Sequence, residues 1–256
     1  MNQTIINTIC SYFTTDCEKN DTVCQWETPL IGFADAADPL FQELKTIVGP
    51  THALPRDFLE DAAGVIAFFL PFDRSIVKSN IPDEYSSKLW ARAYVETNAL
   101  IESINHHLHR WFRDQGYASS IIPPTHNFDK TRLISDWSHR HVAYIAGMGR
   151  FGLNNMLITE KGCCGRFGTI VTNCPTVANP RPNQEYCLYR HNGTCAKCVE
   201  RCPAEALTTK GYDRHKCYDM CLINDNRHHD LPLTDVCGKC LTGVPCSFQN
   251  PVKITE

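Results

Sequence analysis

The sequence predicts a mixed α/β fold, in which a larger α/β body is followed by a small cysteine-rich domain. Residues 64–70 form an uninterrupted apolar run closed by Pro71, which is typical of a strand covered on both faces. Residues 86–115 repeat apolar side chains at helical spacing, which predicts a long amphipathic helix ended by Gly116. Most of the 15 cysteines then gather between residues 187 and 246.

The remaining elements of the body follow from shorter patterns. Leu30, Ile31 and Phe33 predict a first strand, and the spacing of apolar residues in 41–48 predicts a helix after it. Residues 133–146 predict a second helix that leads into a glycine-rich run. Beyond that run, we expect 156–159 and 169–172 to pair as a hairpin around 161–167.

The glycine run Gly147, Gly149, Gly152 formally matches the dinucleotide fingerprint G-x-G-x-x-G. That fingerprint needs a strand before it and a helix after it, whereas here a predicted helix precedes it and a predicted strand follows. We therefore interpret the glycines as positions where backbone approaches a flat ligand closely, and not as a nicotinamide site.

The cysteine-rich segment contains Cys195-x2-Cys198-x3-Cys202-Pro203, the closing part of the bacterial ferredoxin motif. Eight cysteines are what two [4Fe-4S] clusters need, and the cysteine before the proline in such motifs reaches across to the other cluster. The sequence thus predicts a ferredoxin-like domain with two four-cysteine sets: Cys187, Cys195, Cys198 and Cys246 for cluster one, and Cys202, Cys217, Cys237 and Cys240 for cluster two.

Two other interpretations of these cysteines stay open. Paired C-x2-C motifs also suit tetrahedral zinc, so one cluster with one zinc is an alternative. Structural disulfides are another, although the Cys-Pro ending favours iron and sulfur. With either metal interpretation, we expect an N-terminal extension over 1–28, an α/β domain over 29–180 and the cysteine-rich domain over 181–256.

Composition excludes several classes of protein. The chain has no apolar run long enough to cross a membrane, and its first residues lack the basic and apolar regions of a secretory signal. We therefore expect a cytoplasmic protein whose cysteines serve metals. A net charge of −3 gives no electrostatic case for nucleic-acid binding.

Several reactive side chains lie outside the cluster motifs. Cys10, Cys17 and Cys24 are seven residues apart, which on one helix would align them for a metal, although free cysteines more often pack as small apolar groups. The adjacent Cys163 and Cys164 are poor disulfide partners, and we expect a structural turn or a lid thiol there. Cys174 and Cys221 are possible substitute ligands, and the histidines of HHLH (106–109) suit a solvated helix end better than a metal.

The segment AGMGRFGLNNMLITEKGCCGRFGTIVTN, with the two-cluster cysteine array after it, resembles the corresponding region of epoxyqueuosine reductases and of the related reductive dehalogenases. The strands in LIGFADA and VIAFFLPF also resemble the opening of that family. The resemblance implies a nitroreductase-like α/β domain that holds base-off cobalamin, followed by the two-cluster domain. It also implies that electrons pass through the clusters to cobalt. Candidate corrinoid contacts are Gly147, Gly149, Gly152, Asn154, Asn155, Thr169, Thr172 and Asn173.

The chain departs from the family pattern at three points. The sequence stops at Glu256 without the helical-repeat tail that helps hold tRNA, His139 stands where an acid is expected, and Asn154 stands where Lys is usual. We therefore expect tRNA to be an unlikely partner. His139 and Asp136 are the candidate proton donors, since imidazole titrates near neutrality; the alternative for His139 is a surface histidine.

Two main functions follow from these observations, and a third, weaker one is a metal-binding or assembly module whose extra cysteines handle metals. The first is a cobalamin-dependent reductase that acts on a small molecule and receives electrons from a ferredoxin- or flavodoxin-type donor. The second is an electron-transfer protein that activates a partner, such as a corrinoid protein, without substrate chemistry of its own.

Overall fold

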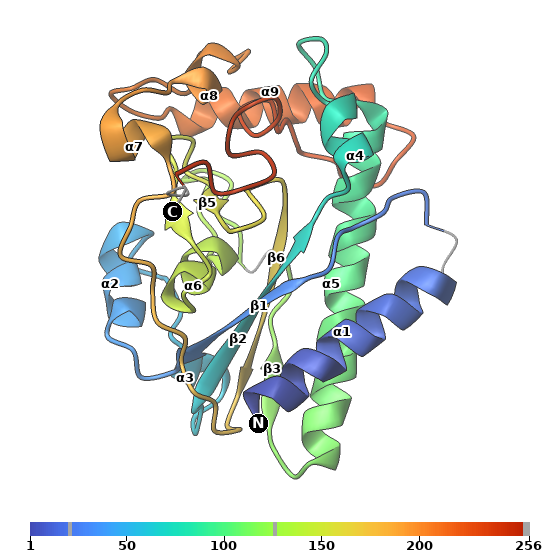
Figure 1. Cartoon of the computed structure of the whole chain (residues 1–256), viewed down its shortest axis with the longest axis vertical. Helices are drawn as coiled ribbons and strands as arrows, with labels where there is room; N and C mark the ends of the chain where they lie inside the picture. Colours follow the sequence, from blue (N-terminus) through green and yellow to red (C-terminus); the bar gives the residue numbers. More distant parts are fainter. Residues whose placement is uncertain (20–21, 125–126, 253–256) are drawn as a thin grey trace.

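The computed structural model describes residues 1–19, 22–124 and 127–252 of the chain, and it has the predicted mixed α/β architecture (Figure 1). Its strands are β1 (Leu30–Asp35), β2 (Gly64–Pro71), β3 (Ser119–Ile121), β4 (Arg150–Phe151), β5 (Leu157–Ile158) and β6 (Gly165–Thr172). Its helices are α1 (Asn2–Lys19), α2 (Leu40–Ile47), α3 (Pro55–Phe58), α4 (Arg74–Ser79), α5 (Lys88–Asp114), α6 (His139–Ile145), α7 (Leu188–Asn192), α8 (Lys197–Glu200) and α9 (Arg214–Arg227).

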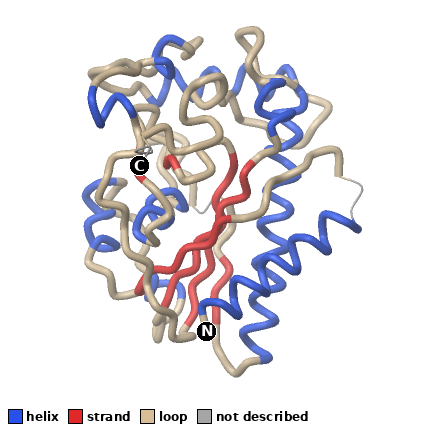
Figure 2. Tube along the Cα trace, viewed as in Figure 1, coloured by secondary structure: helices blue, strands red, loops and turns tan. Residues whose placement is uncertain are grey.

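The central sheet has the order β1-β2-β6-β3 and is antiparallel throughout. The strand β2 is buried along its whole length, as its apolar run predicts. Its side chains alternate: Val65 and Phe69 belong to one apolar core, whereas Ile66 and Phe68 belong to the other. Helices therefore cover both faces of the sheet, α2 and α6 on one side and α1 and α5 on the other (Figures 1 and 2).

The N-terminal helix is part of this core. Ile5, Ile9 and Phe13 of α1 are buried with residues of α5 and the sheet. The helix α5 begins where the Ser87 hydroxyl accepts a hydrogen bond from the backbone N–H of Trp90, and the chain leaves it through Gly116 at φ +80°. Both ends of the predicted long helix are thus confirmed to within two residues.

The second predicted helix is shorter than expected. Only His139–Ile145 is helical, and residues 133–138 are irregular, with Leu133 at φ +53°. Asp136 and Ser138 are residue types that favour turns and helix starts over helix interiors, which explains the late start. Asp136 is therefore not on the helix that carries His139.

The predicted hairpin between 156–159 and 169–172 was wrong. The short strand β5 pairs with β4, while β6 joins the central sheet beside β2. Gly162 lies at φ +79°, and a Cβ there would come within 2.5 Å of the backbone nitrogen of Phe248. The turn before β6 therefore packs against the C-terminal loop, and β6 pairs with β2 and β3.

The cysteine-rich segment, with α7, α8 and α9, lies across one end of the sheet (Figure 1). The buried Asn80 after α4 fixes this segment, because its amide donates to the carbonyl of Cys237 and its own carbonyl accepts from Lys239 and Thr242. Within the described ranges, no helix is long and apolar enough to span a bilayer.

Candidate metal centres and the charged groups beside them

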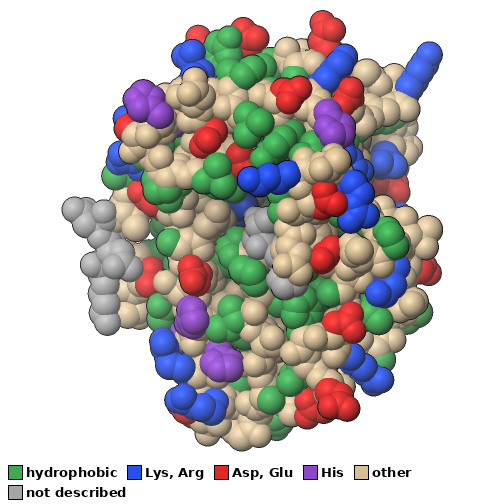
Figure 3. Space-filling view, turned by 180° about the vertical axis from the view of Figure 1, so that it is seen from behind, with side chains coloured by type: hydrophobic (Ala, Val, Ile, Leu, Met, Phe, Trp, Pro, Cys, Tyr) green, Lys and Arg blue, Asp and Glu red, His purple; other side chains and the backbone are tan. Residues whose placement is uncertain are grey.

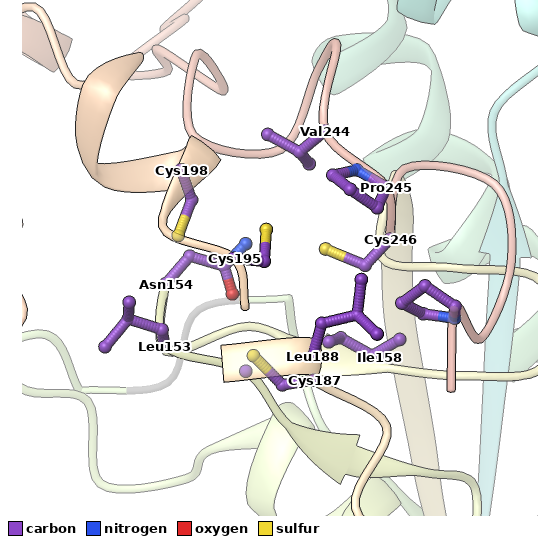
Figure 4. Close-up of a pocket in the computed structure, with 12 residues that line it drawn as sticks. Leu153, Asn154, Ile158, Cys187, Leu188, Cys195, Cys198, Val244, Pro245 and Cys246 are labelled. Atoms are coloured by element: carbon purple, nitrogen blue, oxygen red, sulfur yellow. The ribbon is translucent and has the colours of Figure 1, made fainter. Parts of the chain in front are cut away.

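The four cysteines of the first set lie around one pocket. Cys187, Cys195, Cys198 and Cys246 line one pocket, and Figure 4 shows their sulfur atoms facing a common space. The rest of the lining is mostly apolar, with Leu153, Ile158, Leu188 and Val244 among its members. Burial, and then the nearby thiols of the set, raise the pKa of Cys198 to about 12.

The second set also converges. The thiol of Cys240 interacts electrostatically with those of Cys237, Cys217 and Cys202. A fifth thiol, Cys221, hydrogen-bonds to Cys217 one helical turn before it on α9. This bond, together with one from the Tyr212 hydroxyl, lowers the pKa of Cys217 to about 6.

The two sets are neighbours. Cys198 and Cys246 of the first set pack in one apolar cluster with Cys202 and Cys240 of the second, around Val244. Cys202, the cysteine before Pro203, also interacts electrostatically with Cys237 and Cys240 of the second set.

Contacts from the α/β body hold these loops in place. The backbone N–H of Cys163 donates to the carbonyl of Cys246 at 3.0 Å, just before β6 begins. The buried Asn154 donates from Nδ2 to the carbonyl of Cys240 at 3.1 Å. Gly238 lies at φ +72°, and a Cβ on it would be 2.3 Å from the Trp90 ring. The cysteine loops are therefore positioned by the body as well as by one another.

No group of three or more His, Cys, Asp or Glu side chains in the described part of the chain has the geometry to hold a single metal ion. A cubane cluster separates its four thiolates more widely than one tetrahedral ion does, so four cysteines around a common space suit a cluster.

Sequence reasoning missed two cations beside the second set. Lys239 is 2 % exposed, and its ammonium donates to the carbonyls of Asn80 and Pro82. Arg140 donates to the carbonyl of Asn155 at 2.9 Å and interacts electrostatically with Cys217 and Cys240. Neither cation has a carboxylate within ion-pair distance among the described residues. Lys239 was visible as the cation inside Cys237-x2-Cys240; Arg140 carried no such signal.

A further guanidinium lies between α5 and β6. Arg166 stacks over the Tyr94 ring at 4.2 Å, and its Nε is buried without a hydrogen-bond partner. Asn98, one turn after Tyr94 on α5, has a buried Oδ1 that also lacks a partner. Arg140 lies close enough to Arg166 to lower its pKa, although burial is the larger cause. Unsatisfied buried polar atoms are costly, so this region has the character of a polar ligand site.

His139 is buried at the start of α6 and is not a surface histidine. Its Nδ1 lies 2.9 Å from the Thr169 hydroxyl, which in turn accepts from the Trp137 indole at 2.9 Å. The carbonyl of Pro123, 3.0 Å from Nε2, can only accept a hydrogen bond, so the neutral imidazole carries its proton on Nε2 and its Nδ1 accepts from the Thr169 hydroxyl.

Asp136 is partly exposed and precedes the helix. Its carboxylate accepts a 2.6 Å hydrogen bond from the Thr51 hydroxyl. The structure thus places the two candidate proton donors in different surroundings, one enclosed and one open to solvent.

The candidate corrinoid residues contact different parts of the protein. A Cβ on Gly147 would meet the carbonyl of Pro180 at 2.6 Å, and one on Gly149 would meet that of Ile158 at 2.0 Å. Gly152 closes the β4-β5 hairpin against the side chains of Asn154 and Ile158. In this structure, these glycines therefore allow two segments of the chain to pack closely against each other, and not against a ligand.

The polar residues of that prediction are also bonded within the chain. Asn155 holds φ +58°, and its carbonyl accepts from Arg140. At the far end of β6, the Thr172 hydroxyl donates to the carbonyl of Ala118, and the Asn173 amide donates to the Asp61 carboxylate.

The unassigned cysteines separate into two kinds. Cys24 is buried in an apolar cluster and Cys17 packs at the edge of another, as the packing alternative predicted. Cys174, which the sequence offered as a possible substitute ligand, is also buried in an apolar cluster. Cys163 and Cys221, in contrast, each lie beside a predicted ligand, Cys246 and Cys217. Among the helix-end histidines, His106 pairs with Glu102 at 3.8 Å, and His109 bonds to the Ser119 hydroxyl.

No family model matches the chain. In sequence, it is similar to the epoxyqueuosine reductase of Synechocystis sp., with 28% identity over 198 residues, 74% of this chain and 61% of that protein. The chain therefore spans less than two thirds of the length of the curated relative that it matches.

Solved structures share its fold. Epoxyqueuosine reductase from Bacillus subtilis superposes with a TM-score of 0.56 at 16% identity, covering 94% of this chain and 66% of that one. The enzyme from Streptococcus thermophilus gives 0.55 at 16%, covering 88% and 64%. A catabolic reductive dehalogenase gives 0.55 at 16%, covering 87% and 30%. The resemblance predicted from the glycine segment and the cysteine array is confirmed: the chain is similar to an epoxyqueuosine reductase in sequence, and has the fold of these enzymes and of a reductive dehalogenase.

Proposed function

We propose that the chain is an iron–sulfur oxidoreductase of the epoxyqueuosine reductase type, with a nitroreductase-like body and a ferredoxin-like two-cluster domain. One observation carries this proposal: two sets of four cysteines converge side by side on a fold that epoxyqueuosine reductases share. The contacts from the α/β body described above hold the cysteine loops in place.

The residues present fit two [4Fe-4S] clusters. Cys187, Cys195, Cys198 and Cys246 would hold one, and Cys202, Cys217, Cys237 and Cys240 the other. When bound, the clusters supply one-electron transfer. The chain's own contribution is to keep the sets adjacent through Val244 and to exclude water from the first set with Leu153 and Ile158.

The residues that suit cobalamin best lie between α5 and β6, and not in the glycine run at 147–152. Arg166 Nε and Asn98 Oδ1 are buried polar atoms without partners, and a ligand with amide and phosphate groups would satisfy them. Figure 3 shows that the reverse face of the molecule is hollowed near its centre. When bound, cobalamin supplies a low-valent cobalt as reductant. Tyr94, Asn98 and Arg166 are the side chains that we propose to contact it.

The proton for substrate reduction would come from His139 or from Asp136. Delivery by His139 requires its Nε2–H to leave the carbonyl of Pro123, after which Thr169 and Trp137 still hold the ring through Nδ1. Asp136 needs no such break, since its partner is the hydroxyl of Thr51. Asp136→Asn and His139→Gln separate the two assignments by their effect on the rate of substrate reduction.

The substrate that the relatives suggest is epoxyqueuosine. One of the superposed structures is an epoxyqueuosine reductase with an epoxyqueuosine-modified tRNA stem loop, which makes tRNA a partner to test despite the charge of this chain. A small epoxide or halide free of nucleic acid is the other class of substrate. The electron donor would be a ferredoxin- or flavodoxin-type protein.

The test combines binding and turnover. The anaerobically reconstituted chain is desalted after incubation with hydroxocobalamin, and cobalt is measured with iron. It is then supplied with a low-potential reductant and an epoxyqueuosine-modified stem loop, and product is followed by mass. Cobalt retention and loss of the epoxide oxygen support the proposal. Iron without cobalt, together with reduction of an added corrinoid protein, would instead identify an electron-transfer activator.

A further inference from the structure

The two cysteine sets have unequal electrostatic surroundings. The described lining of the first set contains no charged side chain. The basic residue next to it in sequence, Lys197, is exposed and already pairs with Glu200 at 2.6 Å. The second set has Lys239 between two of its cysteines and Arg140 beside Cys217 and Cys240.

Neither of these cations has a carboxylate within ion-pair distance among the described residues, and Asp83 acts on Lys239 only from farther away. Lys239 bonds to the carbonyls of Asn80 and Pro82, and Arg140 bonds to the carbonyl of Asn155 and the sulfur of Met156. Carbonyls satisfy donors but carry no net charge, and a desolvated cation without a counter-charge is costly. A [4Fe-4S] core with four thiolates is negative in both oxidation states, so it would supply the missing charge.

Hydrogen bonds to sulfur add to the inequality. Cys217 accepts from the Tyr212 hydroxyl and from the Cys221 thiol. In the first set, the side-chain donor is the Cys163 thiol beside Cys246, and the other bonds to sulfur come from the backbone N–H groups of Cys198 and Cys246. Reduction adds one negative charge to a cluster, and nearby cations and donors to the ligand sulfurs favour that state.

We propose that Arg140 and Lys239 give the site of Cys202, Cys217, Cys237 and Cys240 the higher reduction potential, so that it receives the electron that enters at the site of Cys187, Cys195, Cys198 and Cys246. This inference rests on the proposed function, because it requires both clusters. The second site is also the one next to Arg140 and, through it, to Arg166, where the body offers its unsatisfied polar atoms. The positive charges of Arg140 and Lys239 would therefore draw electrons to the cluster site that lies nearer to Arg166.

The experiment is a redox titration followed by electron paramagnetic resonance, without substrate. Cys195→Ala and Cys240→Ala each retain one site and assign the two potentials. We expect the site retained in Cys195→Ala to have the higher potential. Arg140→Gln should lower it enough to change the ratio of reduced to oxidised site about tenfold, which is about 59 mV for a one-electron couple. Arg140→Lys should restore most of it.

The controls make the outcome specific. Lys197→Gln removes an exposed, ion-paired cation beside Cys198 and should change neither potential. Tyr212→Phe removes a hydroxyl from a residue that is 44% exposed, and should lower the potential of the second site alone, even if Arg140→Gln fails to fold.

Equal potentials, a higher potential at the first site, or Arg140→Gln and Tyr212→Phe variants that shift both sites alike would overturn the inference and leave the proposed function standing. A chain that assembles no clusters would overturn both.

Discussion

The Sγ atoms of Cys163 and Cys246 lie 3.9 Å apart, so a cysteine from the turn before β6 touches a predicted ligand of the first cluster site. The two residues are also joined by a hydrogen bond between the Cys163 N–H and the Cys246 carbonyl. The adjacent Cys164 differs, because its thiol donates to the carbonyl of Leu241. The vicinal pair thus has one thiol directed at a ligand and one directed at backbone.

The first prediction follows from that geometry. Cys163→Ala should keep the full iron content, because Cys163 is not a ligand, and should lower the potential of the first site, because a thiol donor to the Cys246 sulfur is lost. The matched control is Cys164→Ala, which should leave this potential unchanged. Loss of half the iron in Cys163→Ala would mean that Cys163 replaces Cys246 as a ligand.

The contact between the body and the second site gives another prediction. Asn154 donates to the carbonyl of Cys240 and accepts from the N–H of Met156, and it is 6% exposed. Asn154→Ala leaves that buried carbonyl unpaired, which should lower the free energy of unfolding by about 1–3 kcal/mol. Chemical denaturation of the apo-chain measures this, and an unchanged midpoint would show that the contact is replaced by water.

Gly238 provides a backbone test of the second site. At φ +72°, an alanine is strained by about 1–2 kcal/mol, and its Cβ would lie 2.3 Å from the Trp90 ring. Gly238→Ala should therefore displace the Cys237 and Cys240 loop and remove iron from the second site before the first. Gly211, where a Cβ would meet nothing within 4 Å, is the control. Equal iron loss from both sites would show that they assemble as a unit.

Stability should fall in mild acid because of His141. Burial, then the charge of Arg140, lowers the pKa of this imidazole to about 4. The unfolded chain, with a pKa near 6.5, binds the proton first, so stability is complete above that pH and is lost as pH falls toward 4. The loss is up to about 3 kcal/mol. His141→Asn should flatten this part of the apo-chain's stability profile, and an unchanged slope would contradict the assignment.

The sequence patterns predicted those parts of the fold that depend on local periodicity. The apolar run at β2 and the helical spacing in α5 indicated their burial and extent. The predicted hairpin was wrong because the apolar pattern of a strand does not record its partner: β5 pairs with β4, and β6 pairs with β2, a strand far earlier in the chain. The short length of α6 reflects the preference of Asp136 and Ser138 for turns, whereas the apolar pattern of 133–146 alone predicted a longer helix.

The candidate site also has parts that the sequence predicted and parts that it did not. The assignment of eight cysteines to two sets rested on a motif whose spacing reflects cluster geometry, and the structure brings both sets together. The glycines were expected to face a ligand, but a sequence does not reveal whether backbone approaches a ligand or another strand. Arg140 and Arg166 lie on different elements, and only the folded chain brings them near each other.

The most direct test of the account is the iron and acid-labile sulfide content of the anaerobically reconstituted chain and of its Cys198→Ala variant. We predict about eight irons and eight sulfides per chain, falling to about four of each in the variant, with the second site retained. One or two metal ions per chain without sulfide, or eight irons retained in Cys198→Ala, would contradict the assignment of two four-cysteine cluster sites.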